Sequence, residues 1–155
     1  MNYKIISIGS DHAGFDTKYI IMSILKNESY EVEDLGIYKK ESSDIYPFIA
    51  EKVSLNVAIK KTDCGILICG TGIGMSISAN KIYGIRAALC HDEYTAIKSR
   101  EHNNSNILVI GSRIVSVELA IKIVHLWLTT EFTGGRHLPR VENIKKVDLK
   151  YRKEF

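Results

Sequence analysis

Short apolar runs alternate along the chain with longer stretches of helical periodicity. The apolar runs, which predict β-strands, are Lys4–Ile8, Tyr30–Leu35, Gly65–Cys69, Ile85–Cys90 and Ile107–Ile110. The stretches of helical period are Phe15–Lys26, Pro47–Lys60, Ile73–Lys81, Glu93–Ser99 and Val117–Thr130. This alternation is typical of βαβ units around a parallel sheet. It predicts an α/β protein with a Rossmann-like, open, five-stranded parallel sheet, helices on both faces and a C-terminal helical extension.

Local signals bound these elements. Pro47 suits the first position of a helix, and Asp92 and Ser116 are of the residue types that cap helix N-termini. A glycine also follows four of the predicted strands, where the chain must turn sharply: Gly9, Gly36, Gly70 and Gly111.

The predicted helix Val117–Thr130 is apolar on more than one side. Its polar residues form one narrow stripe, consisting of Glu118, Lys122, His125 and Thr129. A helix that covers one face of a sheet needs an apolar face only a little wider than about 100°. We therefore expect a second buried side, most simply against another subunit; the alternative is a helix wedged between the sheet and the C-terminal extension.

The length of 155 residues fits a single domain, residues 1–155, and 45% apolar with 25% charged residues is an ordinary globular composition. No stretch is apolar enough to predict a membrane span, and the short apolar run before Asp11 predicts a strand rather than a signal peptide. Three cysteines, Cys64, Cys69 and Cys90, form no CxxC pair. A reducing cytoplasm is the expected location.

The net charge of +3 is unevenly placed. The segment 134–155 has seven lysines and arginines against three acidic residues, so it forms a basic C-terminal extension. Such a segment indicates either an anionic partner or a solvated helix face. Nucleic acid is a poor fit, because the rest of the chain is slightly acidic and carries no nucleic-acid-binding motif.

Candidate chemistry gathers after the strands. In an open parallel sheet, ligands bind outside the carboxyl ends of the strands. The segments predicted at that edge, the second of them opening a helix, are Ser10-Asp11-His12-Ala13-Gly14, Tyr46-Pro47, Cys69-Gly70-Thr71-Gly72-Ile73-Gly74, His91-Asp92 and Ser112-Arg113. Aspartate, histidine, cysteine and arginine beside a glycine-rich turn are the residues of a catalytic site.

The glycine-rich turn after Cys69 is the most specific of these features. Its glycines let backbone amides crowd at a helix start, which favours negative charge and would favour the thiolate form of Cys69. The alternative for this cysteine is a small buried apolar residue, which is also our interpretation of Cys64 and Cys90. The turn is no Walker loop, and Met75 takes the place of the third glycine of GxGxxG. Asp92, about twenty residues on, keeps a dinucleotide site open as a second interpretation.

His102 and Asn103 precede the fifth predicted strand, so we expect them at the opposite edge of the sheet. Arg136 and Arg140 follow the last predicted helix, so we expect them at that opposite edge too, away from the residues after the strands. If these residues serve the site, they serve that of a neighbouring subunit. The alternative for His102 is an inert residue at a helix C-terminus.

Together these residues resemble the ribose-5-phosphate isomerase B family of sugar-phosphate isomerases, which also contains the galactose-6-phosphate isomerase subunits. The matching segments are Gly9–Phe15, Ile45-Tyr46-Pro47, Gly65–Gly74, Ile85–Ala88, Ser99–Asn103 and Gly134–His137. The likeness runs from Lys4 to about Val141.

The resemblance implies an aldose–ketose isomerase that interconverts ribose 5-phosphate and ribulose 5-phosphate through an enediolate, without metal or cofactor. It makes Cys69 the base, His102 of a partner subunit the acid that opens the sugar ring, and Thr71 a proton shuttle. The loop Gly70–Gly74, Ile73 included, would supply amides to the enediolate. The sugar hydroxyls would bind Asp11, Tyr46 and Asn103, and the phosphate would bind His12, Arg113, Arg136 and Arg140. It also implies a homodimer with shared active sites, or a dimer of such dimers.

Some members of the family carry a glutamate as base near the end of the glycine loop. This chain has Gly74-Met75-Ser76 there, which favours the cysteine version. Three other functions remain open: isomerisation of a six-carbon aldose phosphate (allose or galactose 6-phosphate), a nicotinamide dehydrogenase that uses Asp92, and a nucleotide- or nucleic-acid-binding module. Selection for substrate size is expected in the segment from Tyr38 to Ile45.

Overall fold

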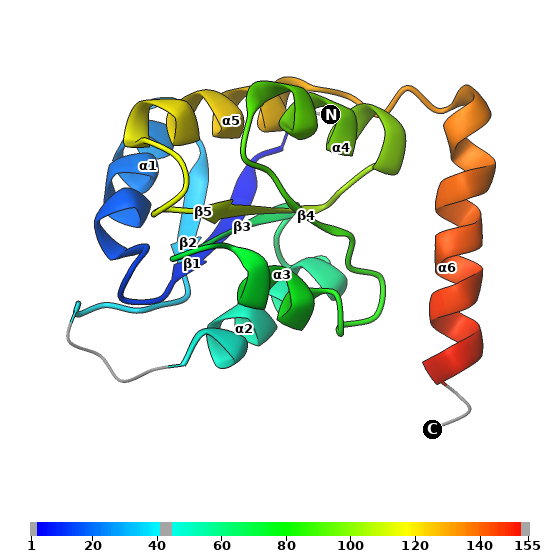
Figure 1. Ribbon diagram of the computed structural model, residues 1–155, viewed down its shortest axis with the longest axis horizontal. Coiled ribbons are helices and arrows are strands. Elements are labelled where there is room, and N and C mark those ends of the chain that lie inside the picture. Colours follow the sequence, from blue (N-terminus) through cyan, green and yellow to red (C-terminus); the bar gives the residue numbers. More distant parts are fainter. Residues whose placement is uncertain (1–2, 41–44, 153–155) are drawn as a thin grey trace.

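A computed structural model describes residues 3–40 and 45–152 (Figure 1). Its five strands are β1 (Ile5–Ser10), β2 (Glu31–Asp34), β3 (Cys64–Cys69), β4 (Ala87–Leu89) and β5 (Ile107–Gly111). They form one parallel sheet in the order β2-β1-β3-β5-β4. The predicted open, Rossmann-like sheet is confirmed, with each strand displaced from its expected bounds by two residues or fewer at either end.

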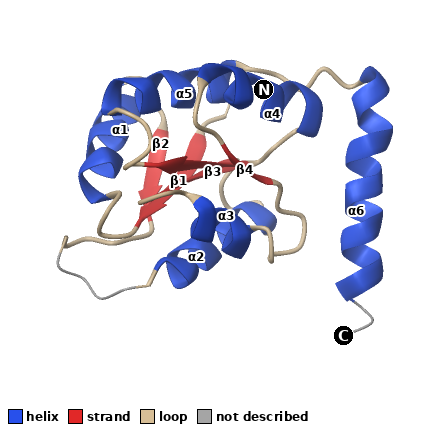
Figure 2. Ribbon diagram, viewed as in Figure 1, coloured by secondary structure: helices blue, strands red, loops and turns tan. Residues whose placement is uncertain are grey.

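The helices lie around this sheet, all but the last of them in two layers (Figure 2). They are α1 (Phe15–Asn27), α2 (Tyr46–Ala58), α3 (Ile73–Ala79), α4 (Glu93–Asn103), α5 (Val117–Thr129) and α6 (Leu138–Arg152), with a 3-10 turn η1 (Gly135–His137) before α6. Apolar side chains of α1, α4 and α5 form one core with the sheet. Those of α2 and α3 form a second core on the opposite face.

The predicted helix boundaries hold where a cap is present. The Asp92 carboxylate accepts the Thr95 N–H at 2.6 Å, and the Ser116 hydroxyl accepts the Leu119 N–H at 3.2 Å. Pro47 lies in the first turn of α2. The two side-chain caps each accept one of the free N–H groups at a helix start, and proline has no N–H that needs an acceptor.

Two elements differ from expectation. Helix α4 continues to Asn103, four residues beyond the predicted end, because the left-handed Asn104 terminates it and donates its N–H to the Arg100 carbonyl. Strand β4 starts later than predicted, since the side-chain oxygens of Asn106 and Asn80 accept the N–H groups of Arg86 and Ala87. His102 therefore lies in the last turn of a helix.

The apolar sides of α5 are covered within the chain. Its buried residues (Ala120, Ile123, Val124, Trp127 and Leu128) face the sheet core, and α4 packs beside it. On its other flank, Ile121 and Val124 meet Ile21 and Leu25 of α1. These contacts give α5 the second buried side that its apolar excess predicted, on α1 and α4 of the same chain. The C-terminal extension α6 does not cover this helix (Figure 1), and a contact with another subunit stays a prediction.

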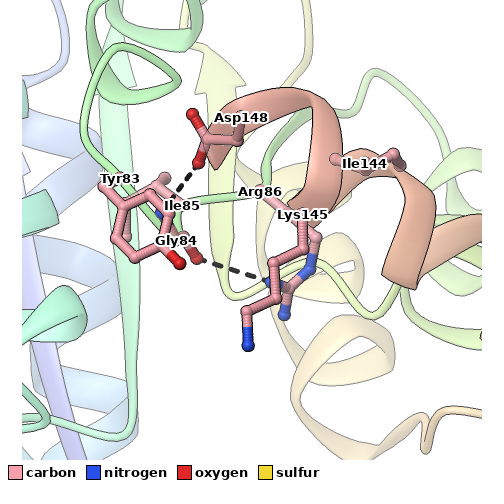
Figure 3. Close-up of a pocket in the computed structure, with 7 residues that line it drawn as sticks. All are labelled: Tyr83, Gly84, Ile85, Arg86, Ile144, Lys145 and Asp148. Carbon is pink, nitrogen blue, oxygen red and sulfur yellow. Dashed lines mark hydrogen bonds between the residues drawn. The ribbon is translucent and has the colours of Figure 1, made fainter. Parts of the chain in front are cut away.

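Helix α6 projects from the body as a separate arm (Figure 1). The Gly84 N–H donates to Asp148 on this arm at 3.1 Å. An open cavity of about 250 Å³ lies between the arm and the segment 83–86 (Figure 3). Much of the arm's apolar surface is exposed, including Leu138, Ile144, Val147, Leu149 and Tyr151. The predicted C-terminal extension is confirmed as a helix. None of the helices in the described ranges is long and apolar enough to cross a membrane.

Candidate active site

A crevice for a ligand is expected at the carboxyl ends of β1 and β3. These neighbouring strands are followed by helices on opposite faces of the sheet, α1 on one and α3 on the other. In open α/β sheets such a reversal leaves a crevice between the two departing chains. Ser10 of β1 lies in register with Ile68 of β3, which brings Asp11 beside the end of β3.

Cys69 ends β3 and reaches this crevice. Its side chain is largely buried, with 5% of the residue exposed. The Sγ accepts a hydrogen bond from the Gly72 amide at 3.1 Å. This turn requires glycine, because Gly72 has φ of +79° and a Cβ there would lie 2.3 Å from Leu89 Cδ1. An N–H donated to sulfur favours the thiolate, the reactive form of cysteine.

The rest of the glycine-rich turn carries Thr71, two residues after Cys69, and packs against the Tyr46 ring at Gly74. The exposed Thr71 side chain accepts the Ile73 N–H at 3.3 Å, which leaves its own hydroxyl hydrogen for another acceptor. A Cβ on Gly74 would lie 2.6 Å from the Tyr46 ring, so the absent side chain makes room for the tyrosine. Two amides of the loop, Gly72 and Ile73, thus have side-chain acceptors already.

Asp11 shapes the loop after β1. Its Oδ1 accepts the N–H groups of Ala13 and Gly14, at 2.9 and 3.1 Å. Gly14 lies so close to β3 that a Cβ would be 2.5 Å from the Ile68 carbonyl oxygen. These contacts place the buried carboxylate and the exposed His12 at the mouth of the crevice.

Ser112 and Arg113 complete this edge after β5. The Ser112 hydroxyl lies 2.9 Å from the Ala13 carbonyl oxygen and 3.1 Å from that of Cys69, so it joins the loops after β1 and β3. The Arg113 side chain runs over Gly70, with its guanidinium 3.5 Å from the point a Cβ would occupy. The sequence pattern predicts no role for Ser112, although this residue follows directly after a predicted strand.

Lys18 was also missed. Its Nζ bonds both carboxylate oxygens of Asp34, at 2.7 and 2.8 Å, and the Ile37 carbonyl at 2.7 Å. The residue is fully buried and fixes the segment after β2. The signal was available, because Lys18 falls on the apolar stripe that Ile21, Met22 and Leu25 form on α1.

A second group of predicted site residues lies elsewhere. His102 and Asn103 end α4, and Arg136 and Arg140 belong to η1 and the start of α6. The two segments meet where the His102 ring stacks on that of His137, with centroids 4.1 Å apart and planes 8° apart. The structure therefore brings His102 and the start of the basic C-terminal extension into one cluster.

The two groups lie at opposite edges of the sheet. Cys69 is in register with Gly111 at the carboxyl end of β5, whereas Gly65 is in register with Ile107 at its amino end. The four residue steps between them span roughly 13 Å. Since α4 leads into the amino end of β5, His102 is remote from Cys69 of its own chain.

Two further sequence interpretations are settled by local contacts. The Asp92 carboxylate is the N-cap of α4, where it accepts the Thr95 N–H, and hydrogen bonds from the Thr95 backbone and side chain lower the pKa of this carboxyl. This capping accounts for Asp92 without a role in ribose binding. Cys64 and Cys90 are buried, and burial raises the pKa of both thiols, that of Cys90 to about 11. Their interpretation as small core residues is confirmed.

The expected size-selecting segment, Tyr38 to Ile45, is only partly visible, since residues 41–44 lie outside the described part of the chain. At the start of this segment the hydroxyl of Tyr38 donates to the Asp34 carbonyl at 3.0 Å. Asp34 is also the residue whose carboxylate bonds Lys18.

Cys69 lies at the switch point of a Rossmann-like sheet, and hydroxyl, carboxylate, imidazole and guanidinium side chains follow the strands at the same edge. This arrangement is typical of an α/β enzyme. The chain matches the Ribose/Galactose Isomerase family over residues 6–144 and belongs to that family.

Similar proteins agree with this assignment. The chain is 48% identical over 145 residues to ribose-5-phosphate isomerase B of Escherichia coli, which covers 94% of this chain and 97% of that protein. It is 42% identical over 139 residues to the D-erythrulose-4-phosphate isomerase of Pectobacterium atrosepticum, covering 90% and 91%. The structure of ribose-5-phosphate isomerase B from Clostridium thermocellum superposes with a TM-score of 0.92, at 50% identity, over 95% of this chain and 99% of that one.

Proposed function

We propose that this protein interconverts ribose 5-phosphate and ribulose 5-phosphate as an aldose–ketose isomerase. The observation that carries the proposal is the Cys69 thiol, which receives the Gly72 amide hydrogen bond at the crevice of a chain in the Ribose/Galactose Isomerase family. The similarity to ribose-5-phosphate isomerase B proteins over almost the whole chain supports the choice of substrate. Isomerases of six-carbon aldose phosphates are the alternative.

In the proposed reaction the Cys69 thiolate takes the C2 proton of the open-chain aldose. The C–H electron pair forms the C1–C2 double bond, and negative charge passes to O1. The Thr71 hydroxyl relays the O2 proton to O1, and the thiol returns its proton to C1, which leaves a ketone at C2. The step is redox-neutral, since both protons stay on the substrate.

The enediolate needs donors that are already in place. Loss of one such donor costs about 3 kcal/mol of transition-state stabilisation in comparable oxyanion sites. The Gly72 amide is directed at sulfur, so it stabilises the thiolate before the reaction and the thiol after it. The Ile73 amide bonds Thr71, so the Thr71 hydroxyl hydrogen and the amides of Gly70, Thr71 and Gly74 are the groups we assign to the sugar oxygens.

Substrate binding uses both groups of residues. We assign sugar hydroxyls to Asp11, through the Oδ2 that does not hold the loop, and to Tyr46 and Asn103. The phosphate would bind His12 and three arginines. Guanidinium groups form paired, charge-assisted hydrogen bonds with phosphate oxygens, which suits Arg113, Arg136 and Arg140 to this role.

His102 is proposed as the acid that opens the ring. It protonates the ring oxygen while the anomeric hydroxyl loses its proton to water and the C1–O bond breaks. Because His102 and Cys69 lie at opposite edges of the sheet in one chain, the acid must come from a partner subunit. We therefore propose a homodimer with two shared sites.

Exposed apolar residues support such a dimer. On the α2–α3 side, Phe48, Leu55, Ile73 and Ile77 are between 43% and 59% exposed. The arm α6 adds a second apolar surface. Surfaces of this kind are usually buried against a partner, and a second copy of this chain fits both the surface and the divided site.

The test is ketose formation by purified, reduced protein in the presence of EDTA. The substrates are ribose 5-phosphate, allose 6-phosphate and galactose 6-phosphate, with D-erythrulose 4-phosphate assayed in the reverse direction. Turnover of the pentose with no comparable turnover of the others supports the proposal. Turnover of another sugar phosphate alone would identify that sugar as the substrate and leave the proposed mechanism unchanged. No turnover of any of them contradicts the proposed function.

We also propose a cytoplasmic location, for which the three unpaired thiols are the support.

A further inference from the structure

His137 is 7% exposed, and nothing in the proposed reaction uses it. Its ring lies on that of His102, with centroids 4.1 Å apart and planes 8° apart. The Arg136 Nε–H donates to His137 Nε2 at 3.4 Å. Because arginine can only donate, this nitrogen of His137 presents its lone pair, and the ring is neutral in this arrangement.

The surrounding charges decide which ring of the pair holds a proton. Burial, followed by the positive groups His102, Arg136 and Arg140, lowers the pKa of His137. Two stacked imidazolium rings would repel each other, so the pair holds one proton more readily than two. His137, the ring subject to both arginines, therefore loses its proton before His102 as the pH rises.

His102 lies in the more favourable position for positive charge. It ends α4, where free carbonyl groups attract a cation, and its Nε2 is 4.0 Å from a carboxylate oxygen of Glu101. Lys98 bonds the same oxygen of Glu101 at 2.6 Å and shares that charge. The neutral face of His137 adds an attraction of the cation–π type.

We propose that His137 is a positioning residue, whose neutral ring orients His102 and keeps the single proton of the pair on His102. This inference rests on the proposed function of His102 as the acid that opens the sugar ring. An acid used near neutral pH must hold its proton there, and the stack supplies that bias. The same ring directs Arg136, since its Nε2 accepts Nε–H and leaves the two terminal nitrogens of the guanidinium for phosphate.

The test is an NMR titration of the histidine ring protons in the full chain, without substrate. The chain has five histidines, and the His102 signal is assigned by its loss in His102→Gln. His137→Leu removes the aromatic face, and His137→Phe keeps it. His125→Leu is the matched control, because His125 is on α5 and pairs with Glu28. Circular dichroism shows whether each variant folds.

We expect the pKa of His102 to fall by about half a unit or more in His137→Leu. It should stay close to the value of the unsubstituted protein in His137→Phe and in His125→Leu. Isomerisation of the cyclic sugar should then lose activity at a lower pH in His137→Leu, because the acid form of His102 disappears earlier as pH rises.

An unchanged His102 pKa in folded His137→Leu, or equal falls in the Leu and Phe variants, would overturn the inference. If His137→Leu does not fold, His137→Gln takes its place, because glutamine also lacks an aromatic face, and an unchanged His102 pKa in that folded variant would overturn the inference. Failure of the proposed function is a separate result: the titration would still show the coupled rings, while the unsubstituted protein would not isomerise the sugar.

Discussion

The Gly72 amide donates a hydrogen bond to the Cys69 sulfur at 3.1 Å, across a turn that only a left-handed residue can make. One glycine thereby sets the path of the backbone and directs an N–H group at the sulfur. Cys64 and Cys90 lie in the sheet core with no such donor from a loop amide among the described contacts.

The three thiols should differ in reactivity. Iodoacetamide at about pH 8 should modify Cys69 about tenfold faster than Cys64 or Cys90, because alkylation needs an accessible thiolate and burial keeps the other two protonated. Mass spectrometry of the alkylated peptides measures the order. The control is Cys69→Ala, which should react only after unfolding in urea. Rapid labelling of this variant in its folded state would contradict the assignment.

Mixing two inactive variants should restore activity if the sites are shared. Cys69→Ala and His102→Gln each damage both sites of their own dimer, but a mixed dimer has one site with both residues intact. Random exchange of subunits should give about a quarter of the original activity on ribose 5-phosphate. Coexpression followed by a steady-state assay measures it. Activity that stays at the level of the separate variants would show that each chain forms its own site.

Lys18 should contribute strongly to stability. Lys18→Met leaves Asp34 without its buried partner, and breaking such a pair costs about 3–5 kcal/mol of unfolding free energy. Lys40→Met is the matched control, since Lys40 pairs with Asp16 on the surface and the loss should stay within about 1 kcal/mol. Urea denaturation followed by circular dichroism compares the two. Equal losses would mean that the buried pair has no special role.

Stability should fall at alkaline pH. Burial raises the pKa of Tyr3 to about 12 and of Cys90 to about 11, above their ordinary values. The unfolded chain therefore binds fewer protons than the folded one once pH passes about 9, so the unfolding free energy decreases as pH rises towards 12. Tyr3→Phe keeps the ring on Trp127 and should flatten the decrease above about pH 10. An unchanged pH profile in this variant would contradict the contribution of Tyr3.

The apolar periodicity of the sequence and its capping residues were sufficient to predict the strands and helices of the fold. Alternating apolar runs and helical periods reflect local rules of side-chain direction, so they predicted five strands and the helices between them. The caps at Asp92 and Ser116 followed from local hydrogen-bonding chemistry. The end of α4 did not, because a left-handed Asn104 terminates it and the loop bonds that hold this turn come from distant segments.

The candidate site was predicted in its residue types and in its division between two sheet edges. Loop order after parallel strands placed Cys69, Asp11 and Arg113 together, and the position of His102 before β5 placed it apart. The apolar excess of α5 predicted a second buried side but not its partner, since a sequence shows how much of a helix is apolar and not which neighbours cover it. Within the chain, α1 and α4 pack against it.

The sequence by itself determined the strand–helix order, the glycine turn and the residues that carry chemistry, because each depends on neighbours within a few positions. Only the tertiary structure decided which of them touch. The stack of His102 on His137 joins α4 to η1 across more than thirty residues of chain, and the contact of Lys18 with Asp34 joins α1 to β2. Such contacts arise from packing around the sheet, which no local pattern contains.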